Sequence, residues 1–69
     1  MMTNQDLKDW RKELRLTQDH AAFLMGITKD GWRRREIGES KVLPETRYAM
    51  EFLRVNPEEI TARLKDFPA

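Results

Sequence analysis

Three consecutive arginines, Arg33, Arg34 and Arg35, form the densest basic cluster of a chain whose formal net charge is only +1. Guanidinium groups bind phosphate oxygens, and their planar fork also matches the O6 and N7 acceptors of guanine in the major groove of a duplex. The basic excess lies in residues 1–41, whereas residues 42–69 are slightly acidic. A solvated helix face is the alternative explanation of the cluster, and charge alone does not separate the two.

The remaining side chains offer little for catalysis or metal binding. The chain has no cysteine and one histidine, His20, so a disulfide framework is excluded and a zinc site is not expected. No nucleophile, base and acid stand at a recognisable spacing, and no glycine-rich phosphate loop is present. The paired Glu58 and Glu59 are explained by a helix start, where carboxylates favour the positive end of the helix dipole. We therefore expect no enzymatic activity and no cofactor.

The elements that must position these groups are helices. Apolar residues recur at helical spacing and no segment alternates as a strand does, so 69 residues predict one all-α domain, 1–69, with a small core. Five helices are expected, the first over about 4–14 and the fourth from residue 44 to about 54. The residues expected to begin or end helices are Thr3, Thr17, Gly26, Thr28, Gly38, Pro44, Asn56 and Pro57.

The aromatic residues are expected to form the core rather than a stacking platform. Trp10 and Phe23 are assigned to it with Trp32 and Phe52. The apolar stripe of the fourth helix is predicted from its spacing to be Tyr48, Ala49, Phe52 and Leu53.

The second and third predicted helices are separated only by "GIT", which indicates a helix-turn-helix unit. Residues 7–53 resemble the Cro/XRE family of phage repressors and small bacterial regulators, because several positions match in one register. The matching residues are Arg11, Thr17, Gln18, Ala22, Gly26, Ile27, Thr28, Glu36 and Gly38. The chain departs from the family pattern at Trp32, usually Ile or Val, and at Arg35, often aromatic.

The resemblance implies a compact, lambda-repressor-like five-helix domain that binds double-stranded DNA. It implies a sequence-specific transcriptional repressor, acting as a homodimer on an inverted-repeat operator and autoregulating its own operon. The compact form also resembles the anti-CRISPR-associated regulators of phages. An antitoxin, which would bind DNA and a toxin partner, is the alternative.

The helix wheel and the resemblance together assign the site residues. Trp32 must point inward. Arg34 then lies on the side that faces the groove, together with Lys29 and Asp30 at the start of the third helix. Asp30, four residues before Arg34, is expected to pair with it. The expected base-reading residues are Lys29, Asp30, Arg33 and Arg34. The expected phosphate-binding residues are Thr17, Gln18, Thr28, Arg35, Lys41 and Arg47. The resemblance also implies a structural ion pair between Arg11 and Glu36.

The C-terminal segment, 53–69, carries Ile60, Leu64 and Phe67 about one helical turn apart. This stripe could cover its own domain beside Phe52 and Leu53, or meet the same stripe of a second copy across a two-fold axis. A DNA-binding domain of this size needs a second copy for specificity, so the two-fold contact is the preferred hypothesis. The expected dimer interface also includes Phe52.

The expected setting is the cytoplasm of a bacterial or phage-infected cell. No apolar run approaches the roughly 20 residues that span a membrane, and the N-terminus lacks the apolar stretch of a signal peptide. No membrane partner is expected, and no residues remain for a separate sensor domain.

Overall fold

The computed structural model describes residues 3–68, which form five helices and no strand. The expected all-α class is confirmed. Residues 1, 2 and 69, which the predicted domain includes, lie outside the described residues. The helices are α1 (Asn4–Glu13), α2 (Gln18–Met25), α3 (Lys29–Glu36), α4 (Pro44–Val55) and α5 (Pro57–Leu64).

Threonine hydroxyls begin the first three helices, as predicted. The Oγ1 atoms of Thr3, Thr17 and Thr28 each accept a hydrogen bond from the backbone N–H three residues later, which satisfies one of the unpaired donors of a helix start. Gly26 ends α2 in the left-handed region at φ 73°, which a residue without Cβ adopts at no steric cost. These caps fix the bounds of α2 and α3, and with them the short connection between the two helices.

Asn56 holds the position immediately before α5, as predicted, but its side chain does not cap the helix. The Asn56 amide nitrogen instead donates to the carbonyl of Phe52 at 2.9 Å, in the last turn of α4. Asn56 therefore completes the end of α4, and proline at the first position of α5 leaves one fewer backbone donor to satisfy.

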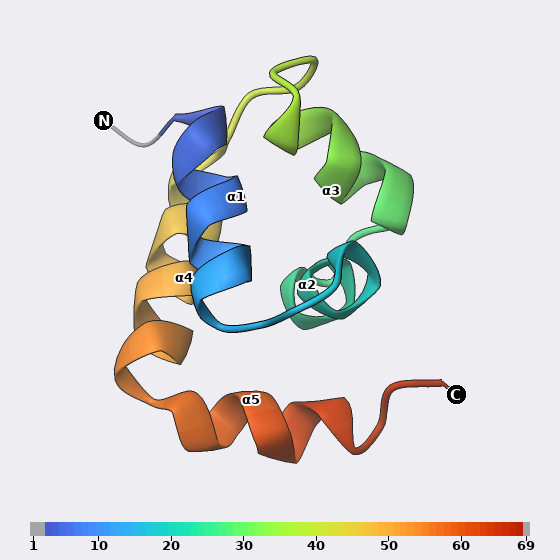
Figure 1. Cartoon of the computed structure of the whole chain (residues 1–69), viewed down its shortest axis with the longest axis vertical. Coiled ribbons are helices and arrows are strands. Elements are labelled where there is room, and N and C mark those ends of the chain that lie inside the picture. Colours follow the sequence, from blue (N-terminus) through green and yellow to red (C-terminus); the bar gives the residue numbers. More distant parts are fainter. Residues whose placement is uncertain (1–2, 69) are drawn as a thin grey trace.

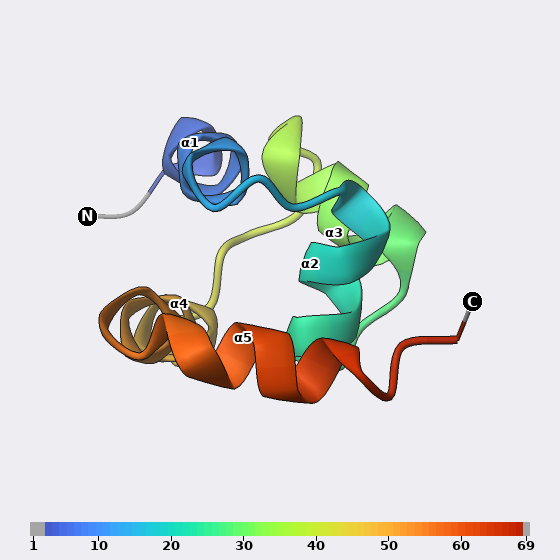
Figure 2. The same cartoon turned by 60° about the horizontal axis from the view of Figure 1, so that its bottom comes forward.

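The helices pack around two tryptophans. In Figure 1, α1 and α4 lie on one side, α2 and α3 on the other, and α5 crosses below; Figure 2 shows α5 running from α4 to α2. The rings of Trp10 and Trp32 are 5.9 Å apart at their centroids, and the Trp10 indole N–H donates to the Met50 carbonyl, which ties α1 to α4. The buried apolar residues are Leu7, Trp10, Leu16, Ala21, Ala22, Leu24, Trp32, Met50, Leu53 and Ile60.

The predicted apolar stripe of α4 is correct at Leu53 and wrong at Tyr48 and Phe52. Met50 and Leu53 face the core and are 2% and 1% exposed, whereas Tyr48 and Phe52 are 67% and 46% exposed. Apolar residues recur at helical spacing on both faces of α4, so the pattern does not decide which face is buried. The face that packs against the core is the one that carries the flexible Met50 side chain. Phe23 is also at the surface, so it and Phe52 are wrongly assigned to the core.

The C-terminal stripe packs within its own chain. Ile60 belongs to the core and Leu64 packs against it, while the Phe67 ring meets those of His20 and Phe23 edge-on at 4.6 and 5.4 Å. Ile60 is thus taken up by the core of its own chain, whereas Leu64 and Phe67 are half-buried, and their contact with a second copy stays a prediction. The stripe packs within its own chain because it covers a side of α2 that would otherwise be exposed to water. Phe52, the fourth residue of that prediction, stays exposed.

Arg15 is the one non-glycine residue of 3–68 with positive φ, at 58°. A Cβ atom in this region clashes with the backbone, so Arg15→Gly should raise the free energy of unfolding by about 0.5–1 kcal/mol. Urea unfolding would measure the change. Arg15→Ala is the matched control, because it removes the guanidinium but keeps Cβ; an equal gain in both variants would contradict the backbone explanation.

Candidate nucleic-acid interface

One face of α3 is buried and the other carries charge. Trp32 is completely buried, as the helix wheel requires, and Glu36 lies one turn further on the same inner face. The predicted base-reading residues, Lys29, Asp30, Arg33 and Arg34, are all exposed. The structure thus brings these four side chains together on the outer face of one helix.

Asp30 binds two of the arginines, not only the expected Arg34. Its Oδ2 lies 2.8 Å from Arg34 Nε, and its Oδ1 lies 2.9 Å from Arg33 Nη2. The hydrogen bond from Arg33, aided by the positive charge of Arg34, lowers the pKa of Asp30 below its usual value. The second contact follows from the three-residue spacing of Asp30 and Arg33, a signal that the sequence contains.

Arg35 is engaged with its own helix. Its Nη1 donates to the carbonyl of Gly31 at 2.8 Å, and the side chain is half-buried. The guanidinium approaches this closely because Gly31 has no Cβ, which would lie 3.2 Å from Arg35 Nη1. In the free protein the Arg35 guanidinium therefore binds a backbone carbonyl of its own helix, and its contact with phosphate stays a prediction.

Glu36 is the centre of a buried polar network. Its carboxylate accepts hydrogen bonds from Arg11 Nε at 2.6 Å and Nη2 at 3.3 Å, and from the Trp32 indole N–H. The Glu36 side chain is 2% exposed and that of Arg11 is 14% exposed. The predicted ion pair is therefore present and largely withdrawn from water. It joins the end of α3 to α1, which fixes the direction in which α3 presents its outer face.

Gln18, expected to bind phosphate, belongs to the same network. Its Nε2 donates to Glu36 Oε1 at 3.3 Å. Because one amide proton is already used there, only the second remains for a phosphate. Burial alone would raise the pKa of Glu36, but the hydrogen bonds from Arg11, Trp32 and Gln18 outweigh it and lower the pKa below 4.5.

The other predicted phosphate-binding residues lie at the surface. Thr17 and Thr28 use their hydroxyl oxygens as caps, which leaves each hydroxyl proton able to donate. Lys41 and Arg47 are exposed, and the Arg47 guanidinium lies 5.9 Å from the centre of the Tyr48 ring. Within the described residues, no side-chain hydrogen bond or salt bridge joins these four residues to the arginines of α3.

One charge contact near α3 escaped the sequence reading. Lys29 Nζ lies 3.8 Å from Asp19 Oδ2, so the start of α3 is linked to the first turn of α2. Both side chains are more than half exposed, so the contact is weak. Ten residues separate the pair in the sequence, and no helical spacing could have indicated it.

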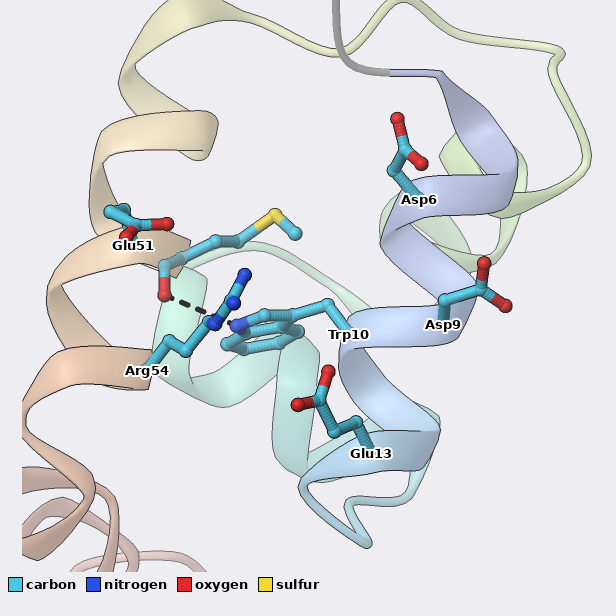
Figure 3. A pocket seen from close by; sticks show the side chains of 7 residues that line it. Asp6, Asp9, Trp10, Glu13, Glu51 and Arg54 are labelled. Carbon is cyan, nitrogen blue, oxygen red and sulfur yellow. Dashed lines mark hydrogen bonds between the residues drawn. The ribbon is translucent and has the colours of Figure 1, made fainter.

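A pocket of about 240 Å³ lies between α1 and α4, away from the outer face of α3 (Figure 3). Its floor is formed by Trp10 and Met50. Its charged lining residues are Asp6, Asp9, Glu13, Glu51 and Arg54. Within residues 3–68, no three His, Asp or Glu side chains are grouped closely enough to hold a metal ion.

No protein-family model, curated protein or solved structure matches this chain. Among the described residues, no helix is both long enough and apolar enough to cross a membrane.

Proposed function

We propose that this protein is a sequence-specific duplex-DNA-binding repressor of the Cro/XRE type, which autoregulates its own operon. The observation that carries the proposal is the outer face of α3, where Arg33 and Arg34 stand exposed while Trp32 and Glu36 anchor the opposite face. A major groove about 12 Å wide admits one helix, and guanidinium groups are its commonest specific readers. The resemblance of residues 7–53 to this family supports the same conclusion.

In this proposal α3 enters the major groove and α2 braces on the backbone. The N-termini of both helices carry hydroxyl groups, Thr17 and Thr28, whose protons can be donated to phosphate oxygens. Lys41 and Arg47 contact the phosphates on the side of α4. Phosphate contacts supply affinity and orientation, whereas the α3 side chains supply sequence preference.

Two copies are needed, because a single short helix contacts only a few base pairs. We place the contact between copies on α4, since α5 is already packed. Tyr48, Phe52 and Val55 stand exposed at positions i, i+4 and i+7, and Glu51 and Arg54 give their flank both signs of charge. An apolar stripe flanked by opposite charges is complementary to a copy of itself.

Phe52→Glu should weaken dimerisation about tenfold without unfolding the chain, because an exposed ring is replaced at a self-contact. Light scattering across a concentration series would measure it. Ile60→Asp is the contrasting variant and should lower the melting temperature, since Ile60 is in the core. A Phe52→Glu protein that dimerises as tightly as wild type would place the contact elsewhere.

The experiment that tests the function is selection of bound sites from a pool of random duplexes. We expect an enriched inverted repeat with half-sites about 10 base pairs apart, the spacing that brings two helices to one face of DNA. Affinity for the selected site should fall as salt is raised, because phosphate contacts release counterions. A pool without enrichment, or an affinity independent of salt, would contradict the proposal.

An antitoxin is the second candidate, and the exposed stripe of α4 is the observation that favours it. Tyr48, Phe52 and Val55 would then contact a toxin instead of a second copy. Co-purification of the chain with the product of a neighbouring gene would distinguish this function from that of a lone repressor.

A further inference from the structure

We propose that Asp30 is a specificity-determining positioning residue, whose carboxylate holds Arg33 and Arg34 together and orients the free end of Arg34 toward the edge of a guanine. The inference rests on the proposed function, and it deepens the account of the same α3 face. In this inference Asp30 orients the arginines, whereas the sequence predicts that it contacts bases directly.

The helix geometry explains why one carboxylate reaches two arginines. Around the helix, residue i+3 lies about 60° to one side of residue i, and residue i+4 lies about 40° to the other. Asp30 is therefore one turn before Arg33 and Arg34 and between them. Each carboxylate oxygen serves one arginine, Oδ1 at 2.9 Å from Arg33 Nη2 and Oδ2 at 2.8 Å from Arg34 Nε.

The arrangement has consequences for base reading. Oδ1 accepts two hydrogen bonds from Arg33 and Oδ2 contacts Arg34 Nε, so at most one of the carboxylate's roughly four acceptor positions is left for the N4 amine of cytosine. Arg34, held at Nε, keeps its two terminal nitrogens for the O6 and N7 atoms of guanine. Asp30 thus orients Arg34 and does not itself contact a base.

The same carboxylate discourages binding to arbitrary DNA. Its negative charge lies among the basic residues of α3 and repels phosphates, whose attraction supplies most of the affinity for non-specific duplex. It also neutralises part of the positive charge of Arg33 and Arg34, which on an unrelated sequence could only bind phosphate. A matching guanine offers two acceptors to the pre-oriented guanidinium. The negative charge of Asp30 therefore lowers the affinity for the specific site less than the affinity for other DNA.

A second explanation is that Asp30 only stabilises α3. An acidic residue in the first turn of α3 and basic residues in the last turn both favour the helix dipole. That account predicts an effect of Asp30 on helix stability and none on the choice among DNA sequences. The ratio of specific to non-specific affinity therefore separates the two explanations.

The test is Asp30→Asn, which removes the charge at nearly constant shape. Binding is measured by fluorescence anisotropy to the selected site and to a scrambled duplex of the same length. Affinity for the scrambled duplex should rise about fivefold, with a salt slope steeper by about 0.9, as for one additional phosphate contact. Affinity for the selected site should stay within about twofold, because the gain in charge is offset by a less ordered Arg34. The ratio of the two affinities should therefore fall.

Asp19→Asn is the matched control, because Asp19 also contacts a basic residue of α3, namely Lys29, but holds neither arginine. It should change both affinities by the same factor. Asp30→Glu keeps the charge and should keep the ratio near that of wild type. An unchanged ratio in Asp30→Asn, or a fall of the same size in Asp19→Asn, would overturn the inference while leaving duplex binding intact. A wild-type chain that binds no duplex would instead overturn the proposed function, and the inference with it.

Discussion

Arg11→Met is expected to lower the free energy of unfolding by about 3–5 kcal/mol at neutral pH, because it leaves the Glu36 carboxylate buried without its cation. The Glu36 side chain is 2% exposed, so water cannot replace the lost partner. The variant also loses the hydrogen bond from Arg11 Nη1 to the Leu16 carbonyl, at 3.1 Å. Chemical denaturation of the wild type and the variant would measure the difference.

The pH dependence of this difference identifies its cause. In the wild type the pKa of Glu36 is lowered from 4.5, so its contribution to stability is complete above about pH 4.5 and is lost as the pH falls through the lower folded value. In Arg11→Met we expect burial to dominate and to raise the pKa of Glu36 above 4.5. Protonation then relieves the buried charge, so the gap between the two proteins should begin to narrow above pH 4.5 and should narrow further as the pH falls below it.

Lys12→Met is the matched control, since Lys12 is the next residue of α1 and is exposed. It should change the free energy of unfolding by less than about 0.5 kcal/mol. An Arg11→Met protein as stable as Lys12→Met, or a gap that stays constant with pH, would show that the Arg11–Glu36 pair does not carry this stability.

The features predictable from sequence are those set by neighbours along the chain. The caps at Thr3, Thr17 and Thr28 involve residues only three apart, and their geometry is local. The inward direction of Trp32 follows from one apolar residue among charged ones in α3. The Arg11–Glu36 pair spans 25 positions, and it was found because the family resemblance placed both residues, not because of their spacing.

The features that sequence could not determine depend on how helices rotate against one another. Both faces of α4 contain apolar residues, and only packing selects Met50 and Leu53 over Tyr48 and Phe52. The C-terminal stripe could cover its own domain or meet a second copy, and only the structure shows that it packs against α2 of its own chain. The Gln18 side chain can point either to solvent or to the buried Glu36 carboxylate. Its inward direction depends on where the fold places Glu36.

Arg34→Ala should weaken binding to the selected site by about 1–3 kcal/mol and relax the preference for one G·C pair, because its fork is the best-placed reader of guanine. Half of the side chain is exposed, and its contact with Asp30 is a surface ion pair, so the fold should survive. Repeating the random-sequence selection with the variant would show which position of the site loses its preference.

Arg34→Lys separates reading from charge. Lysine keeps the positive charge but presents a single ammonium in place of a planar fork. We expect it to retain much of the salt-dependent affinity while losing discrimination at the same base pair. Arg33→Ala, which removes the other guanidinium held by Asp30, should weaken binding with a smaller change in base preference, since one terminal nitrogen of Arg33, Nη2, is already engaged by Asp30. An Arg34→Ala protein that selects the same sequence as wild type would show that α3 meets DNA with a different face.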